Sequence, residues 1–244
     1  MTGRRPMLSP WPFTPAVKSI LVACGAIWLA CVICVHWADF PTPYEVLRLE
    51  PNRVIGGLEL WRLLTWIWVH DPDGLAHVLL NGLFLWMFGG ALELAWGSRA
   101  FWRYYLTCGI GSGVAVLACS AIFGAETPVV GASGAVYGLV IAWVFINPER
   151  PVWLFGLFPI KGRHFALIPI GLALADFLLR APGVSHVAHL GGMAIGALLI
   201  TGYWRPGRLA ARLRTWRLRR GLRVHEGGAR GPQSGRTLHR VRDA

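Results

Sequence analysis

Residues 131–147 read GASGAVYGLVIAWVFIN, an apolar segment that opens with a serine between glycines. Its 17 residues reach the lower limit for a helix that crosses a bilayer. Ser133 has only small neighbours, so another helix can approach it closely. Polar side chains are costly to place in hydrocarbon, and they usually face one another or a water-filled cavity. The segment therefore predicts a membrane helix with a polar site near its first turn.

The composition of the whole chain is typical of a membrane protein. Of its 244 residues, 55% are hydrophobic and 15% are charged, and the mean hydropathy is +0.49. A soluble domain has about 25% charged residues. Six apolar stretches, each near the ~20 residues that a spanning helix needs, lie at residues 17–37, 75–97, 100–124, 131–147, 164–179 and 185–204. The sequence therefore predicts an all-α membrane domain over residues 17–204, a six-helix bundle with a long first outer loop at residues 38–74.

The positive charge of the chain is concentrated in its C-terminal tail. Residues 205–244 contain 12 arginines and two acidic residues, which supply +10 of the formal net charge of +12. With six spans both termini lie on one side, and that side then holds 20 of the 24 Lys and Arg residues. Membrane proteins keep such an excess on the cytoplasmic side. We therefore expect residues 1–16 and the tail in the cytoplasm. We interpret the tail as a disordered topology anchor at anionic lipids rather than a nucleic-acid-binding segment.

This orientation brings four polar residues to one level. The second, fourth and sixth spans all begin on the outer face, and near those beginnings lie His77 and Asn81, Ser133, and His189. At 1.5 Å per residue, all four lie within roughly 10 Å of the outer boundary. We therefore expect these side chains to share one site that water reaches from outside.

Sequence spacing predicts which helix faces meet. His77 and Asn81 are four residues apart and share one helix face, and Ser133 shares a face with Tyr137 in the same way. Small residues recur at this spacing too, and such stripes let helix backbones pack closely in lipid. They are Gly134 and Gly138 on the fourth helix and Gly192 and Gly196 on the sixth. We expect packing through these glycines to bring Ser133 within hydrogen-bond distance of His189.

These residue types fit nucleophilic catalysis by a serine. The Ser133 hydroxyl is a poor nucleophile by itself, but an adjacent imidazole can accept its proton and later return it to a leaving amine. The tetrahedral intermediate then needs hydrogen-bond donors, for which His77, Asn81 and the Ser133 backbone N–H are candidates. No carboxylate lies near His189 in the sequence. We therefore expect a dyad of Ser133 with His189, in which Tyr137 either stacks on the imidazole or only packs.

Together these residues resemble the rhomboid family of intramembrane serine proteases, over about residues 55–200. The matching motifs are Trp61-Arg62, His77-x-x-x-Asn81, Gly131-Ala132-Ser133-Gly134-x-x-Tyr137 and Ala188-His189-x-x-Gly192-x-x-x-Gly196. The resemblance implies a six-helix bundle and a dyad of Ser133 with His189. It places His77 and Asn81 in the oxyanion hole and implies no cofactor and no metal. It also implies that substrates are single-span membrane proteins, cut within or beside a transmembrane segment that has locally unwound.

The long outer loop is rich in aromatic residues. Trp61, Trp66 and Trp68 lie among leucines, and such amphipathic rings occur at membrane interfaces. In the family the corresponding loop is partly embedded beside the bundle, and the resemblance implies a structural role for the pair Trp61-Arg62. Contact of Arg62 with a lipid phosphate is the alternative that the sequence leaves open.

One histidine departs from the family pattern. Many bacterial rhomboids have a histidine five residues before the His-x-x-x-Asn motif, whereas His70 lies seven residues before His77. The sequence Asp71-Pro72-Asp73-Gly74 lies between them and predicts a turn. We therefore expect His70 to make a structural hydrogen bond in the loop, and we leave it out of the catalytic set.

Two other functions stay open at this point. A non-proteolytic rhomboid-like protein would bind client helices, although such relatives generally lack the serine or the histidine and both are present here. A metal or haem site would use the histidines expected on the outer side, which are His70, His77, His186 and His189. A metal site, however, gives no reason for a serine among glycines, and the HExxH motif is absent. Abundant Ala, Gly and Arg with short loops favour a bacterial inner-membrane protein.

Overall fold

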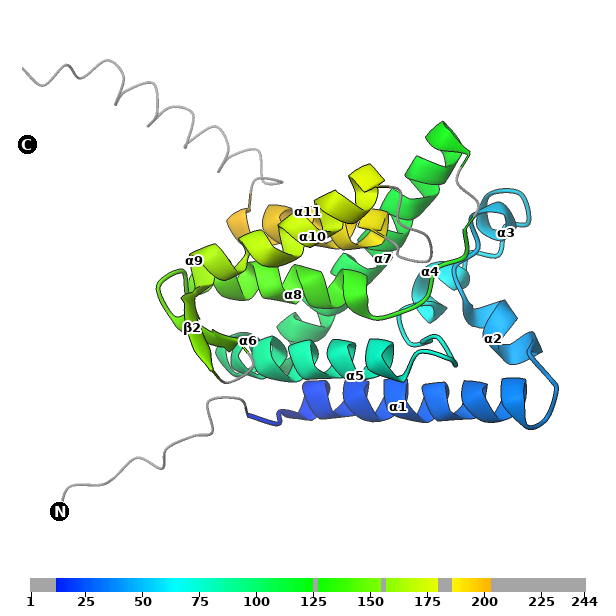
Figure 1. Ribbon diagram of the computed structural model, residues 1–244, viewed down its shortest axis with the longest axis horizontal. Helices are drawn as coiled ribbons and strands as arrows, with labels where there is room; N and C mark the ends of the chain where they lie inside the picture. The colour runs from blue at the N-terminus through cyan, green and yellow to red at the C-terminus, as the bar shows by residue number, and fades with distance from the viewer. Residues whose placement is uncertain (1–11, 125–126, 155–156, 180–185, 203–244) are drawn as a thin grey trace, which may run out of the picture. The chain divides into compact units, whose positions relative to one another are not determined.

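The chain folds into a bundle of helices with one small β-hairpin (Figure 1). The computed structural model describes residues 12–124, 127–154, 157–179 and 186–202. The expected basic tail lies outside the described residues, and so does most of the expected N-terminal segment.

Each of the six apolar stretches contains a helix whose bounds lie within about three residues of the prediction. These helices are α1 (Pro15–His36), the unbroken run of α5 (Leu75–Phe84), η1 (Leu85–Gly89) and α6 (Gly90–Trp96), then α7 (Ser98–Phe123), α8 (Ser133–Ile146), α10 (Leu167–Leu179) and α11 (His186–Thr201). The predicted helices are therefore confirmed. One short helix, α9 (Gly162–Phe165), directly precedes α10.

The helices differ in whether they are long enough to span a bilayer. Three apolar helices have sufficient length, at 22, 22 and 26 residues, and they are Pro15–His36, Leu75–Trp96 and Ser98–Phe123. The other apolar helices in the described part of the chain are shorter, and they are Ser133–Ile146, Gly162–Ala175 and His186–Thr201. The protein is thus an integral membrane protein with three full-length candidate spans, and the count of six spans stays a prediction.

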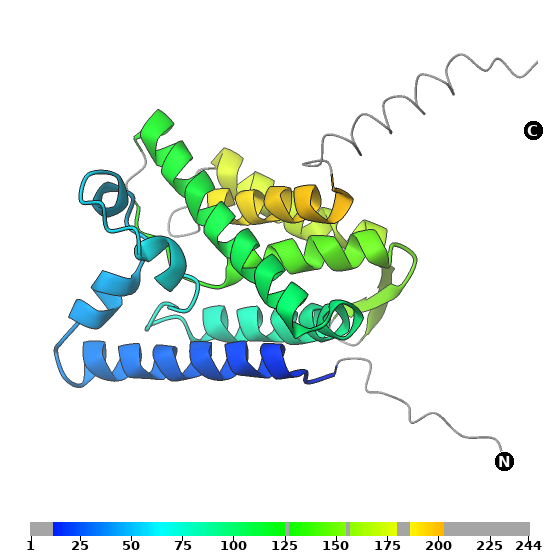
Figure 2. The same ribbon diagram turned by 180° about the vertical axis from the view of Figure 1, so that it is seen from behind.

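The outer loop contains short helices that the sequence pattern did not predict. They are α2 (Thr42–Leu47), α3 (Pro51–Ile55) and α4 (Arg62–Thr65), and Figure 2 shows them grouped beside one end of α1. Both α2 and α3 have a proline in their first turn, where its missing N–H breaks no hydrogen bond. The hairpin of β1 (Pro151–Leu154) and β2 (Phe158–Lys161) lies between α8 and α9 in the chain.

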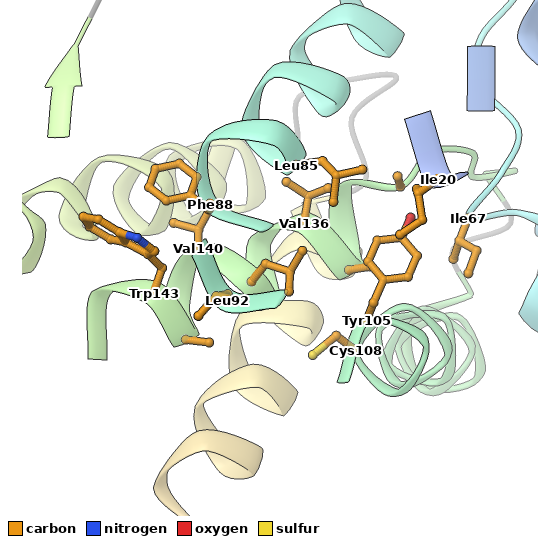
Figure 3. Packing of buried hydrophobic residues seen from close by; sticks show 14 of the residues in the cluster. Ile20, Ile67, Leu85, Phe88, Leu92, Tyr105, Cys108, Val136, Val140 and Trp143 are labelled. Atoms are coloured by element: carbon orange, nitrogen blue, oxygen red, sulfur yellow. The ribbon is translucent and has the colours of Figure 1, made fainter. Parts of the chain in front are cut away.

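Helix α8 is buried at the centre of the bundle. Its first twelve residues, except Tyr137, are all buried. Figure 3 shows Val136, Val140 and Trp143 of α8 packed with Leu85 and Phe88 of η1. A helix that is apolar on all sides is typically enclosed by other elements rather than amphipathic. The 14 residues of α8 are therefore surrounded mainly by protein, with Ser133 as its first residue.

A buried carboxylate fixes the beginning of α1. Glu93 of α6 is 3% exposed and accepts hydrogen bonds from the backbone N–H groups of Ala16 and Val17, at 2.9 and 3.0 Å. The hydroxyl groups of Thr14 and Ser98 also donate to it. Free N–H groups at a helix N-terminus favour a negative charge. Glu93 thereby joins α1, α6 and the beginning of α7.

Candidate active site

Helices α8 and α11 approach each other through their glycines. A Cβ atom on Gly192 would lie 2.0 Å from the carbonyl oxygen of Gly134, and one on Gly196 would lie 2.8 Å from the Cα atom of Gly138. Such distances leave no room for a side chain, so these positions require glycine. The close packing predicted from the two stripes is confirmed, and it sets the distance between the first turns of both helices.

A tyrosine of α7 reinforces this contact. The Tyr104 hydroxyl lies 2.8 Å from the carbonyl oxygen of Gly196 and 3.1 Å from that of Gly138. Ser112 of α7 lies against the first turn of α8, because a Cβ atom on Gly134 would be 2.1 Å from its hydroxyl oxygen. Helix α7 therefore packs against α8 and α11 together. Sequence reasoning missed these contacts, since a tyrosine in an apolar helix usually only packs.

Ser133 and His189 lie within hydrogen-bond distance of each other. The Nε2 atom of His189 is 2.9 Å from the Oγ atom of Ser133. The ring of Tyr137 lies against the His189 ring, with the two centroids 4.4 Å apart and the planes tilted by 33°. Ser133 is 8% exposed and His189 is partly buried. The structure thus brings together the serine, the histidine and the aromatic ring that the sequence singled out.

Gly131 brings the backbone before Ser133 into close contact with His77. Its φ angle is +119°, a conformation that side chains disfavour. A Cβ atom there would lie 2.7 Å from Nε2 of His77 and 3.8 Å from Oγ of Ser133. The backbone conformation and the contact with His77 therefore both require glycine. His77 and Ser133 both lie within 4 Å of this Cβ position, so a nucleophile and a hydrogen-bond donor are close together, as acyl transfer requires.

Asn81 lies on the same helix face as His77, one turn further along α5. Its amide Nδ2 donates to the backbone carbonyl of His77 at 2.9 Å, and the residue is 8% exposed. An amide nitrogen has two hydrogens, and among the described residues the second has no acceptor. The predicted pairing of these two residues on one face is confirmed.

The segment before Ser133 is bonded to the outer loop along its length. Val129 exchanges two backbone hydrogen bonds with Leu49, at 2.8 and 2.9 Å. The N–H group of Gly131 donates to the carbonyl oxygen of Trp66 at 3.0 Å, and that of Ala132 donates to Nε2 of His70 at 3.4 Å. The outer loop therefore sets the position of the backbone that leads into the serine. Sequence reasoning missed the two backbone contacts, because backbone pairing leaves no mark in side-chain patterns.

His70 is neutral and fully buried behind this segment. Burial is the main cause that lowers the pKa of His70 to about 4, the nearby His77 lowers it further, and the neighbouring Trp68 backbone partly opposes both effects. Because Nε2 accepts from the Ala132 N–H, the proton of the neutral ring lies on Nδ1. The rings of His70 and His77 lie edge to face, 5.2 Å apart. The structural hydrogen bond expected for His70 is present.

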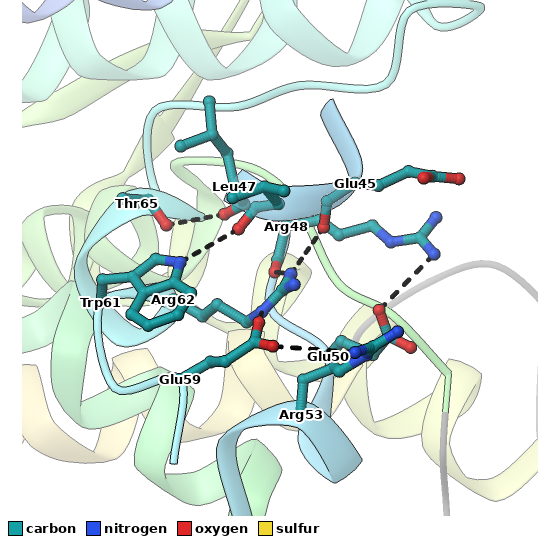
Figure 4. A network of polar contacts seen from close by, with 10 residues as sticks. Glu45, Leu47, Arg48, Glu50, Arg53, Glu59, Trp61, Arg62 and Thr65 are labelled. Atoms are coloured by element: carbon teal, nitrogen blue, oxygen red, sulfur yellow. Dashed lines mark hydrogen bonds and ion pairs between the residues drawn. The ribbon is translucent and has the colours of Figure 1, made fainter. Parts of the chain in front are cut away.

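Arg62 is buried in the outer loop and does not face lipid (Figure 4). It is 4% exposed, and its Nη1 donates to the carbonyl oxygens of Glu45 and Arg48 at 2.6 and 2.7 Å. Its Nε donates to the carboxylate of Glu59 at 2.5 Å. Contact of Arg62 with a lipid phosphate, one of the two alternatives left open, is therefore wrong, because the side chain is buried and these bonds hold the guanidinium inside the loop. The structural role is the correct one.

The histidines do not form a metal site in the described part of the chain. No group of three or more His, Cys, Asp or Glu side chains there is arranged to hold a metal ion. Two of the ring nitrogens have other partners, since His70 accepts from a backbone N–H and His189 faces Ser133. The described cysteines are free thiols. The geometry therefore favours serine chemistry over metal or haem binding.

Comparison with known proteins identifies the family. Residues 57–206 match the family model described as the Rhomboid domain. The chain is 34% identical over 154 residues to RHOMBOID-like protein 4 of Arabidopsis thaliana, a match that covers 62% of this chain and 36% of that protein. It is 31% identical over 148 residues to Rhomboid protease GluP of Bacillus subtilis, covering 60% and 27% of the two chains. It is 30% identical over 190 residues to Putative rhomboid protease YdcA of the same organism, covering 76% and 86%.

The extent of these matches differs between relatives. The chain spans only about a third of RHOMBOID-like protein 4 and less of GluP, but most of YdcA. The family model, in contrast, covers more than half of this chain. The chain therefore belongs to the rhomboid family.

Proposed function

We propose that this protein is an intramembrane serine endopeptidase that cleaves transmembrane proteins within or near their membrane-spanning segment. One observation carries the proposal: Ser133 Oγ lies 2.9 Å from His189 Nε2. The names of GluP and YdcA, a protease and a putative protease, support the same reaction class.

The geometry supports a reaction in two halves. Ser133 Oγ forms a bond to the scissile carbonyl carbon while its proton moves to Nε2 of His189. Collapse of the tetrahedral intermediate breaks the C–N bond, and His189 gives the proton to the leaving amine. Water then hydrolyses the acyl-enzyme with the same imidazole as base. No cofactor takes part in either half.

The negative oxygen of the intermediate needs preorganised donors. We assign this role to His77, Asn81 and the backbone N–H of Ser133, which is the first residue of α8 and so belongs to a turn whose N–H groups have no partner within the helix. The Nε2 atom of His77 lies close to the backbone at Gly131, two residues before Ser133, so His77 is near the place where a carbonyl group attacked by Ser133 would lie. Tyr137 holds the imidazole plane by ring contact.

The substrates that we propose are single-span membrane proteins whose helix has locally unwound near the cleavage site. An extended peptide is needed because a helix hides its backbone carbonyl groups in internal hydrogen bonds. We further propose that both termini are cytoplasmic and that the site opens to the outer face of a bacterial inner membrane. The distribution of Lys and Arg supports this orientation.

Cleavage of a model single-span substrate in liposomes tests the proposal. We expect the wild-type protein to produce two fragments, and Ser133→Ala and His189→Ala each to lower the rate by a factor of about 10³ or more. Matched controls are Ser120→Ala, another buried serine, and His164→Ala, an exposed histidine, which should cleave at the wild-type rate. Full cleavage by Ser133→Ala would contradict the dyad. Substrate binding by the wild type without any cleavage would favour the non-proteolytic alternative.

A further inference from the structure

A long apolar groove separates α1 from the second membrane helix. Its volume is about 530 Å³. Leu21, Gly25 and Trp28 line it from α1, and Val78 and Gly82 line it from α5. Figure 1 shows the two helices running side by side. Both belong to segments that are long and apolar enough to span a bilayer, so the groove lies at the depth of the hydrocarbon.

The back wall of the groove is also a wall of the serine site. His70, Asn81 and Ala132 line its inner side. Ala132 directly precedes Ser133, and its N–H bonds to His70. Whatever fills the groove therefore contacts the residues that hold the catalytic segment in place.

Glycine keeps the groove open. A Cβ atom added to Gly25 would meet no atom within 4 Å, and one added to Gly82 would meet Leu21 at 3.1 Å. The rim residues Leu29 and Leu79 are 53% and 60% exposed. In a bilayer these exposed leucines face lipid, so the groove is continuous with the surrounding hydrocarbon.

The dimensions of the groove fit a single hydrocarbon chain. Along α5 and η1 it extends from Leu75 to Trp86, about 17 Å at 1.5 Å per residue. This is about half of the ~30 Å hydrocarbon thickness, the depth of one leaflet. An acyl chain of one leaflet spans this depth, and it can enter the groove from the surrounding hydrocarbon along the exposed rim at Leu29 and Leu79.

We propose that this groove is a binding site for one acyl chain of a bilayer phospholipid. The bound chain fills the space between α1 and α5 and supports the wall formed by Asn81 and Ala132 from behind. The lining is apolar except for the back wall, as burial of a hydrocarbon chain requires. The proposal does not depend on the protease assignment and can be tested with Ser133→Ala protein.

Photolabelling with a phospholipid tests the site. Full-length Ser133→Ala protein is reconstituted in phosphatidylcholine vesicles that contain a phosphatidylcholine with a diazirine midway along one acyl chain. After illumination, mass spectrometry locates the labelled residues. We expect labels concentrated on groove residues of α1 and α5, above the level on other lipid-facing helices.

Gly25→Phe places a ring in the groove and should displace the chain. We expect labelling of α5 to fall about tenfold, a change that corresponds to ~1.4 kcal/mol of binding free energy. Gly171→Phe is the matched control, because a Cβ atom on Gly171 of α10 also meets no atom within 4 Å, and it should leave labelling of α5 unchanged. Gly25→Val adds a smaller side chain and should give an intermediate decrease in the labelling of α5. It replaces Gly25→Phe in the test if the Phe variant does not fold.

Two results would overturn the proposal. One is equal labelling of α5 in Ser133→Ala protein with and without Gly25→Phe, where the Phe variant is folded. The other is a uniform distribution of labels over all lipid-facing helices, which is expected if lipid touches the groove only as it touches any surface. Crosslinking of α1 to a second copy in place of lipid would assign the groove to a dimer instead.

Discussion

Two polar regions of this protein, the serine site and the Arg62 network of the outer loop, use their buried groups in opposite ways. The guanidinium of Arg62 donates to two carbonyl groups and one carboxylate within its own loop. In the serine site, Ser133 and His189 bond to each other, and His77 lies close to the backbone two residues before the serine. The first region uses its polar groups for structure, whereas the second pairs a hydroxyl group with an imidazole that can accept its proton.

The two regions are also joined physically. Backbone bonds from Leu49 and Trp66 of the outer loop hold the segment that leads to Ser133. A loop folded around a buried arginine can therefore set the position of a serine more than 60 residues away in the chain. We therefore expect substitutions in the serine site to lower the reaction rate, and substitutions in the Arg62 network to lower stability.

The largest effect that separates the two regions is expected for Asn81→Ala. Loss of one oxyanion donor typically lowers kcat by about 10²–10³, while the melting temperature should change little. The control is Asn147→Ala at the other end of α8. Its amide makes the same bond to the carbonyl four residues earlier, at 3.1 Å to Trp143, so it removes the same type of contact away from the site. Kinetics with a single-span substrate check this, and equal losses in both variants would remove Asn81 from the reaction.

The second prediction concerns stability of the outer loop. Arg62→Met leaves the Glu59 carboxylate and two carbonyl groups without their donor, which should lower the free energy of unfolding by about 3 kcal/mol. Arg53→Met is the control: Arg53 also pairs with Glu59, at 3.8 Å, but its side chain is 62% exposed, and such pairs contribute about 0.5 kcal/mol. The free energies of unfolding of both variants are measured in detergent micelles and compared with that of the wild type. If Arg62→Met has wild-type stability but no activity, the division between the two regions is wrong.

A smaller effect is expected from the pH dependence of stability, through His70. The pKa of His70 is about 4 in the folded protein, against 6.5 as its ordinary value. The unfolded chain therefore binds more protons between these values, so stability is full above pH 6.5 and falls as the pH drops towards 4. Between pH 7 and pH 5 the loss should be about 2 kcal/mol.

Unfolding at several pH values with two variants checks this prediction. His70→Gln should reduce the loss by the contribution of this histidine, because glutamine does not take up a proton. His36→Gln, which alters a partly exposed histidine paired with Asp73, should retain it. An unchanged pH dependence in His70→Gln would show that other groups cause the loss.

Much of the fold could be predicted from apolar length alone. The bounds of the long helices followed from hydropathy, because lipid and the buried core both require continuous apolar residues. The contact between Ser133 and His189 could be predicted from glycines spaced four residues apart, since only glycine permits the observed approach of α8 and α11. These are local patterns that a sequence displays directly.

The remaining features depend on contacts between distant segments. Glu93 accepts hydrogen bonds from residues up to 79 positions away, and no local pattern indicates such a partner. Helices of four to six residues, such as α2 and α4, are too short for a hydrophobic period. For Arg62 the sequence left structure and lipid contact as alternatives, because the deciding acceptors are backbone carbonyl groups that every residue possesses.

Labelling of the purified protein in liposomes with a fluorophosphonate tests the central claim most directly. Such a reagent reacts with a serine only when a neighbouring base activates its hydroxyl. The account predicts one adduct, located on Ser133 by mass spectrometry, that is absent in Ser133→Ala and strongly reduced in His189→Ala. An adduct on another serine, or undiminished labelling of Ser133 in folded His189→Ala, would contradict it.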